Sequence, residues 1–153
     1  MERVHEYEAS CSWRGSTAIG YESYERSHQA VAFPARATLD LSSDSAFRGN
    51  SERLNPEQLL LMAASSCQLL SFLAVCARAH IDVRQYEDQA AALMPEGNHP
   101  VRLTTIVLRP KIEVAKGPTE ERVRNLVEVA HEECYVANSL KSDVRVEPEI
   151  RFI

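Results

Sequence analysis

Residues 55–79 read NPEQLLLMAASSCQLLSFLAVCARA, and this stretch decides the fold. Asn55 is a favoured N-cap residue, Pro56 suits the first helical position, and Glu57 lies where the positive end of a helix dipole attracts an anion. Charged residues are almost absent from residue 58 to residue 77. Because apolar residues fall on nearly every face, the pattern predicts a helix, ending near residue 79, that is enclosed by protein.

The segments before this helix predict antiparallel sheet. Residues 4–41 are rich in Ser, Thr, Tyr and Val, and the strands that we expect there are His5–Trp13, Thr17–Tyr24 and His28–Ala32. The polar run 42–53 is typical of a surface loop.

The segments after the helix predict a hairpin, a second helix and a last strand. Residues 81–94 and 101–114 are rich in Val and Ile and flank a short turn, as the two arms of a β-hairpin do. Thr119 is positioned to cap a helix whose buried stripe extends to Cys134, and residues 144–153 fit a final strand. The order sheet, helix, hairpin, helix, strand indicates an α+β fold.

Length and composition limit the class of protein. A chain of 153 residues, 44% hydrophobic and 25% charged, has the size and composition of one globular domain, which we place at residues 1–153. The formal net charge is −5, and the charge is dispersed. Because binding to a phosphate backbone requires a basic footprint, nucleic acid is not an expected partner.

The sequence does not predict a membrane or secretory segment. The longest strongly apolar run, Leu59–Ala64, is far shorter than the ~18–20 residues that cross a bilayer. Residues 1–6 include the charged residues Glu2, Arg3 and Glu6, where a signal peptide would need an apolar core. We therefore expect a cytoplasmic protein that has no membrane partner.

Four cysteines are the main candidates for chemistry. None belongs to a C-x-x-C pair, so the spacing does not indicate a metal site. Each could simply be a small buried apolar residue, and we expect this core role for Cys11 and Cys76. Cys67 differs because the small residues 63–66 leave room beside its thiol. Cys134 differs because polar residues surround it near a helix end.

Two segments together resemble the OsmC/Ohr family of thiol peroxidases. The first segment reads N-P-E-Q-L-L at residues 55–60 and A-S-S-C at residues 64–67, so that Cys67 lies ten positions after Glu57. The second segment reads A-H-E-E-C-Y-V-A-N-S-L at residues 130–140 and contains Cys134. The opening W-x-G at residues 13–15 is also similar to the family. The resemblance implies an OsmC-like fold, with antiparallel sheets around a long buried central helix, and an intertwined homodimer with sites near the subunit interface.

The resemblance also implies a chemistry. Cys67 would be the peroxidatic thiolate that attacks the O–O bond of an organic hydroperoxide and becomes a sulfenic acid. Cys134 would resolve it as a disulfide, which an external dithiol, lipoyl-type or another small thiol, then reduces. Such a protein would serve as an antioxidant in the oxidative stress response, and its chemistry requires no cofactor: no metal, flavin or haem.

This chemistry requires a cation near the first thiol. Cys67 lies roughly 15 Å along the helix, whereas the helix dipole acts mainly over the first turn. In the family an Arg, oriented by the Glu of the N-P-E motif, keeps the thiol ionised, and Glu57 matches that Glu. Arg48 is our first candidate for this Arg, and Arg26 and Arg14 are the alternatives.

One departure from the family leaves other functions open. Family members commonly have Pro after the second cysteine, whereas Tyr135 follows Cys134 here, so resolution could be slower or use an external thiol. The first alternative is a non-enzymatic module that binds a small apolar ligand in the same fold. The second is a redox-sensing interaction protein.

Overall fold

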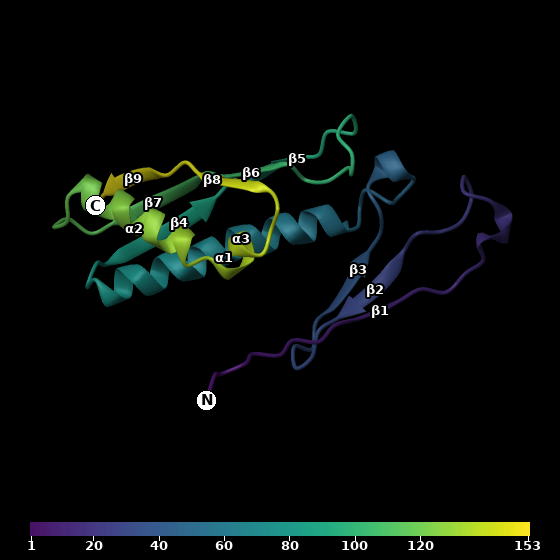
Figure 1. Ribbon diagram of the computed structural model, residues 1–153, viewed down its shortest axis with the longest axis horizontal. Coiled ribbons are helices and arrows are strands. Elements are labelled where there is room, and N and C mark those ends of the chain that lie inside the picture. Colours follow the sequence, from purple (N-terminus) through teal and green to yellow (C-terminus); the bar gives the residue numbers. More distant parts are fainter. The chain divides into compact units, whose positions relative to one another are not determined.

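The computed structural model describes residues 1–153, which form two compact units, residues 1–59 and 60–153. Its regular elements are helices and small sheets (Figure 1), as the α+β prediction requires. The long helix α1 (Pro56–Arg78) begins at the end of the N-terminal unit and supplies the first element of the C-terminal unit.

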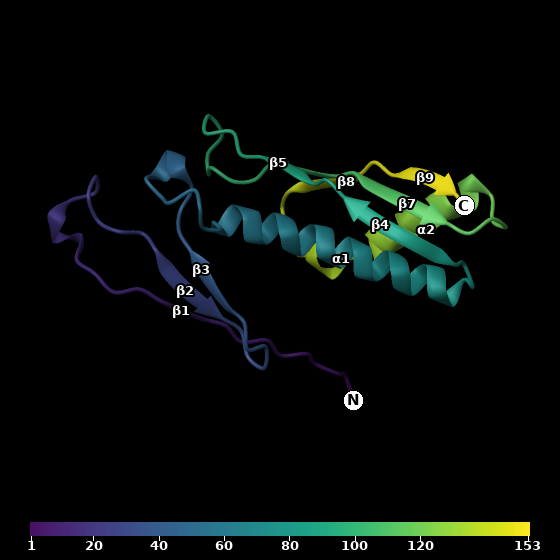
Figure 2. The ribbon, with the colours of Figure 1, turned by 180° about the vertical axis from the view of Figure 1, so that it is seen from behind.

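The N-terminal unit contains one three-stranded antiparallel sheet. Its strands β1 (Ser10–Ser12), β2 (His28–Val31) and β3 (Thr38–Leu41) lie side by side in that order (Figure 2). The predicted strand near residue 28 is therefore confirmed. The third strand was not expected from the sequence.

Two expectations for this unit are wrong. Thr17–Ile19 is a 3-10 helix and not part of a strand, because the Ser16 hydroxyl caps its first turn and Gly20, at φ 93°, ends it. Cys11, expected in the core, is exposed because β1 is an edge strand whose three residues all face solvent.

The predicted start of α1 is confirmed by a reciprocal cap. The Asn55 Oδ1 atom accepts a hydrogen bond from the Gln58 backbone N–H at 2.9 Å, and the Gln58 Oε1 atom accepts one from the Asn55 backbone N–H at 3.0 Å. This capping box satisfies two backbone donors that have no partner inside the helix. At the other end, His80 adopts a left-handed conformation, with φ 56°, which stops the helix.

The C-terminal unit is built on six short strands in two sheets, with orders β4-β7-β9 and β5-β6-β8. The strands are β4 (Val83–Asp88), β5 (Ala91–Leu93), β6 (Thr105–Leu108), β7 (Pro110–Val114), β8 (Asp143–Val146) and β9 (Glu149–Phe152). Along the chain, β4 is followed by β5, β6 by β7 and β8 by β9, and a short break separates the two strands of each pair. Each of these three chain segments therefore contributes one strand to each sheet.

The pairing confirms the predicted hairpin but corrects the type of sheet. The pairs β4–β7 and β5–β6 are antiparallel, whereas β6–β8 and β7–β9 are parallel. The sheets are therefore mixed, not purely antiparallel. The physical reason is the helical crossover through α2 (Glu120–Glu132), which returns the chain to the same end of the sheet before β8 begins.

The side chain of Asp88 connects the break in the sheet to α1. One of its oxygens accepts a hydrogen bond from the Arg109 backbone N–H at 2.6 Å, and the other accepts one from the Ser65 hydroxyl at 2.5 Å. At the break, the Asp88 carboxylate thus takes the place of a backbone hydrogen-bond acceptor from a neighbouring strand. It also fixes the turn of α1 that precedes Cys67.

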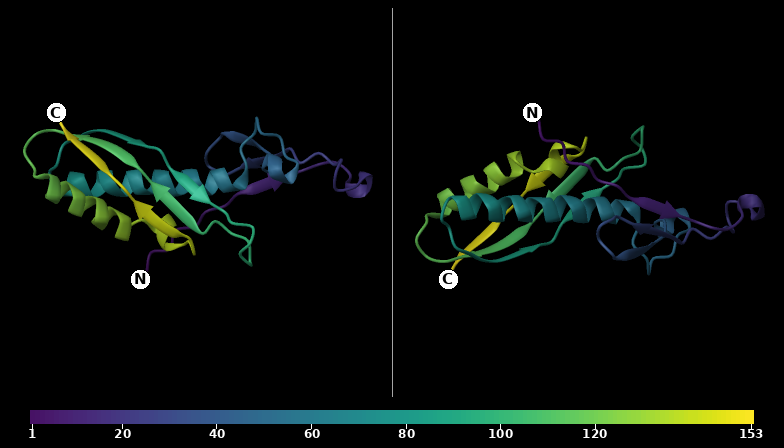
Figure 3. Two further views of the ribbon diagram at one scale, coloured as in Figure 1. Left: turned by 90° about the horizontal axis from the view of Figure 1, so that it is seen from above. Right: turned by 90° about the horizontal axis from the view of Figure 1, so that it is seen from below.

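Both α1 and α2 lie on the same face of these strands (Figure 3), and the main core fills the space between them. Its buried members come from α1, α2 and the sheet: Phe72, Val75, Cys76, Ile81, Ile112, Val114, Val123, Val127 and Ala130. In the single chain, α1 is not enclosed on every face, because Met62, Leu70 and Leu73 are exposed.

By length and apolar composition, α1 as a whole qualifies as a helix that could cross a membrane. Core helices of soluble proteins pass the same test.

The buried Cys76 predicts a loss of stability at high pH. Burial raises the pKa of its thiol from 9.0 to about 11, so the folded protein holds this proton more tightly than the unfolded chain. The free energy of unfolding should therefore be unaffected by this thiol below about pH 9 and decrease by roughly 2–3 kcal/mol as the pH rises to about 11.

Urea unfolding across this pH window, for the wild-type protein and Cys76→Ala, measures the effect. The wild-type protein should lose more stability with rising pH than the variant does. Equal losses in the two proteins would show that the proton on Cys76 does not contribute.

Candidate functional site

The structure brings together the two cysteines that the sequence singled out. Cys67, half-buried in α1, and Cys134, which is buried after the end of α2, are both free thiols. The Cys67 thiol lies near the Cys134 thiol and contributes to the raised pKa of that thiol. The fold of the C-terminal unit therefore brings together two thiols that are 67 positions apart in the sequence.

A break in the helix places Cys134 near Cys67. The sequence predicted a helix whose buried stripe extends to Cys134, but α2 ends at Glu132, and Cys134 has an extended conformation at the start of the short α3 (Tyr135–Asn138). The Asn138 backbone N–H donates to the Cys134 carbonyl at 3.0 Å, and its side-chain amide donates to the Glu132 carbonyl at 2.9 Å. These two bonds hold the bend that directs Cys134 inward.

The environment of Cys134 keeps its thiol protonated at neutral pH. Burial raises its pKa to about 11, and the neighbouring Cys67 thiol acts in the same direction, against the opposing effect of the Ala137 backbone N–H. This cysteine is therefore suited to supply a proton together with its sulfur.

Buried polar groups also lie near these thiols. The Tyr86 hydroxyl has no hydrogen-bond partner, and its pKa is raised by burial and by the nearby groups Asp88 and Cys134. The Gln68 side chain donates to the Val127 carbonyl at 3.3 Å, while its own oxygen is unpaired. The thiols are thus not enclosed by hydrocarbon alone.

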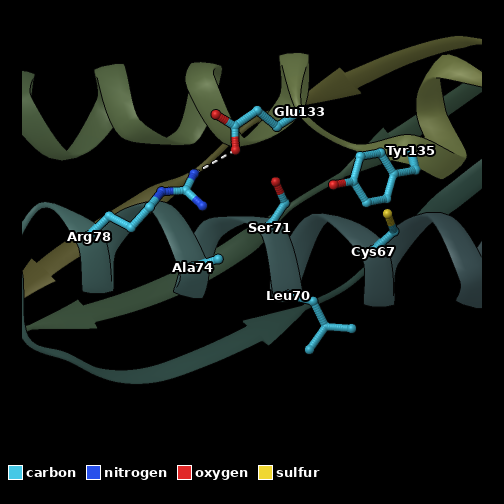
Figure 4. Close-up of a pocket in the computed structure, with 7 residues that line it drawn as sticks. All are labelled: Cys67, Leu70, Ser71, Ala74, Arg78, Glu133 and Tyr135. Carbon is cyan, nitrogen blue, oxygen red and sulfur yellow. Dashed lines mark hydrogen bonds and ion pairs between the residues drawn. The ribbon is translucent and has the colours of Figure 1, made fainter. Parts of the chain in front are cut away.

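Cys67 opens onto a pocket of ≈ 240 Å³ that runs along α1 (Figure 4). Four of its lining residues, Cys67, Ser71, Ala74 and Arg78, are spaced by four, three and four positions, which places them on one face of the helix. Leu70, Glu133 and Tyr135 complete the lining. The pocket therefore extends from the thiol toward the C-terminal end of α1.

A cation that the sequence analysis missed lies in this pocket. The Arg78 Nη2 atom donates to the Glu133 Oε2 atom at 2.6 Å (Figure 4). An Arg near a helix end is usually read as a solvated residue, and only its helical spacing from Cys67 could have indicated a shared pocket.

The predicted Arg48 and Glu57 belong to the N-terminal unit. There the Arg48 guanidinium forms an ion pair with Glu22, and no ion pair joins it to Glu57. Since the two cysteines belong to the other unit, the roles of Arg48 and Glu57 toward Cys67 stay predictions.

The alternative cations differ in their surroundings. The Arg26 side chain is buried, donates to the carbonyls of Tyr21 at 2.5 Å and Tyr24 at 2.6 Å, and lies over both aromatic rings. Such a guanidinium has a structural role within its own unit. Arg14 is exposed. In neither unit do three or more His, Cys, Asp or Glu side chains form a group that could hold a metal ion.

Comparison with known proteins identifies relatives of this chain. A family model described as OsmC-like protein matches residues 49–149. An OsmC-like protein of unknown function from Vibrio cholerae is similar in structure, with a TM-score of 0.86, 24% identity, and coverage of 95% of this chain and 100% of that one.

Two further solved structures carry more specific names. The organic hydroperoxide resistance protein from Elizabethkingia anophelis has a TM-score of 0.74, 19% identity and full coverage of both chains. The organic hydroperoxide resistance protein OsmC from Legionella pneumophila has a TM-score of 0.68 and 16% identity, covering 97% of this chain and 98% of that one. A comparison with curated proteins gives no match.

Proposed function

Because the chain belongs to the OsmC-like protein family, we propose that it is a thiol peroxidase that reduces organic hydroperoxides. The observation that carries this proposal is the proximity of the Cys67 and Cys134 thiols beside a pocket that Cys67 lines. The names of the Elizabethkingia and Legionella proteins also support it.

In the first step the Cys67 thiolate attacks one oxygen of the hydroperoxide. An S–O bond forms, the O–O bond breaks, and the departing alkoxide takes a proton and leaves as an alcohol. Cys67 is oxidised to a sulfenic acid. Its position on the wall of an open pocket gives the hydroperoxide a path to the sulfur.

In the second step Cys134 attacks the sulfur of the sulfenic acid. A disulfide forms, and the hydroxyl group leaves as water with the proton that the Cys134 thiol releases. The proximity of the two thiols favours this step. An external dithiol then reduces the disulfide and restores both thiols.

Further parts of the proposal concern partners and positioning. We propose a homodimer, which would cover exposed apolar residues of α1 such as Met62 and Leu73, because burial of such residues is favourable. Arg48, with Glu57 as its partner, is the proposed cation that keeps Cys67 ionised.

The proposed reductant is a dithiol, either lipoyl-type or another small thiol. The protein is proposed to act in the cytoplasm in the response to oxidative stress.

Oxidation of the wild-type protein by one equivalent of cumene hydroperoxide tests the proposed function. We expect a single intramolecular disulfide between Cys67 and Cys134, identified by mass spectrometry of proteolytic peptides, and continued peroxide consumption when dihydrolipoamide is supplied. Cys76, whose pKa burial raises to about 11, serves as an internal control and should remain reduced.

Two results would contradict the proposal. A protein that binds the peroxide but forms no disulfide is a ligand-binding module. A protein that forms the disulfide but shows no steady-state consumption with the dithiol is a redox sensor.

A further inference from the structure

The pocket beside Cys67 has two chemically different ends. At one end is the thiol, and at the other is the Arg78 guanidinium, which pairs with Glu133 (Figure 4). Between them lie Leu70 and Ala74, an apolar wall without charge. A ligand that fills this space would have a reactive group, an apolar body and an anionic end.

The separation of the two ends limits the shape of such a ligand. Arg78 lies eleven positions after Cys67, which corresponds to about 16–17 Å between their Cα atoms along the helix. The Arg side chain shortens this span, because helical side chains lean toward the N-terminus. The small side chains of Ser71 and Ala74, one helical turn apart, leave room for an extended chain above α1.

Arg78 has donors available for a second anion. Its Nη2 atom donates to Glu133, whereas its Nε and Nη1 atoms have no hydrogen-bond partner in the protein. A guanidinium presents five N–H donors in a planar fork, enough to hold two carboxylates at once. The side chain is 62% exposed, so a ligand can reach these free donors from solvent.

The middle of the pocket offers few polar competitors. The Ser71 hydroxyl already donates to the Ala130 carbonyl at 2.8 Å, and Leu70 and Ala74 have no polar side-chain atoms. A neutral hydroperoxide and one with a distant carboxylate would therefore contact the same wall. They would differ because only the second has a carboxylate that can pair with the Arg78 guanidinium.

We propose that Arg78 is a specificity-determining residue, which binds the carboxylate of an elongated aliphatic hydroperoxide while the peroxide group lies at Cys67. The proposal rests on the proposed peroxidase function, because that function makes the Cys67 end of the pocket the reactive one. Glu133 is the competing internal anion: it orients the guanidinium and repels the ligand carboxylate at the same time.

A matched pair of substrates tests this assignment. One is ω-hydroperoxydecanoate and the other is its methyl ester, which has the same reactive group and chain but no charge. The wild-type protein should show the higher kcat/KM with the acid. Arg78→Gln should reduce this acid-to-ester preference by roughly tenfold, the loss expected for one charge-assisted interaction, and change the ester rate little.

Two variants sharpen the result. Glu133→Gln removes the competing carboxylate and should increase the preference for the acid, whereas a general structural effect would slow both substrates. Arg84→Gln is the matched control, because Arg84 is also an exposed Arg of the C-terminal unit, pairs with Asp82 at 2.7 Å and does not line the pocket. It should leave the preference unchanged.

Direct binding separates this inference from the peroxidase proposal. Titration calorimetry with decanoate, which carries no peroxide, should detect binding to the wild-type protein and weaker binding to Arg78→Gln. If both hydroperoxides react but show equal kcat/KM, the peroxidase function stands and the role of Arg78 is overturned. If neither reacts while decanoate binding depends on Arg78, the anion site stands and the peroxidase function fails.

Discussion

Replacement of Cys67 by Ser is expected to lower the steady-state rate of peroxide consumption by roughly a thousandfold or more. The proposed reaction passes its electrons through the Cys67 sulfur, and a serine hydroxyl can form neither a sulfenic acid nor a disulfide. Cys67 is half-buried in the middle of a long, capped helix, so the exchange of sulfur for oxygen should leave the fold intact. Peroxide consumption with dihydrolipoamide as reductant measures the loss.

Cys11→Ser is the matched control for this experiment. The same atom is exchanged, but Cys11 is exposed on β1, in the N-terminal unit. This variant should keep the wild-type rate. Substantial turnover by the Cys67 variant, or an equal loss in both variants, would remove Cys67 from the proposed reaction.

The features of the fold that the sequence predicted correctly are those set by short-range interactions. The α1 cap depends on Asn55 and on a backbone N–H three residues later, and the α2 cap at Thr119 works in the same way. The hairpin of β4 to β7 also joins neighbouring segments. Such elements can be read from a few adjacent residues.

The features that were missed depend on contacts between distant segments. Parallel pairing of β6 with β8 requires the chain to return through α2, and nothing in residues 144–153 specifies which neighbour they will find. Cys11 was placed in the core because a lone cysteine is commonly a small buried apolar residue, but residue type does not tell whether another element covers the strand that carries it.

For the same reason, the sequence indicated the two cysteines of the candidate site but not its arginine. The resemblance to a family and the apolar stripe of α2 pointed to Cys67 and Cys134, and the structure brings their thiols together. Arg78 was missed because its neighbour Glu133 lies 55 residues later, at the end of another helix. Whether a charged residue is solvated or lines a pocket depends on that distant partner.

Cys134→Ala should convert the protein from a catalyst that turns over many times into one that is inactivated by its substrate. Cys67 can still be oxidised to the sulfenic acid, but the neighbouring thiol that would form the disulfide is absent. A further equivalent of peroxide then oxidises it to the sulfinic acid, which dithiols do not reduce. We expect the steady-state rate with dihydrolipoamide to fall by at least about tenfold, and the remaining activity to be lost during the assay.

Intact-mass measurement of each protein after peroxide treatment distinguishes disulfide formation from overoxidation of Cys67. The wild-type protein should lose two hydrogen atoms, whereas Cys134→Ala should gain two oxygen atoms on Cys67. Cys76→Ala is the control, since Cys76 and Cys134 are each 1% exposed and both substitutions remove one buried sulfur from the C-terminal unit. If the Cys134 variant keeps the full rate and its mass, an external thiol resolves Cys67, and the proximity of the two thiols has no part in turnover.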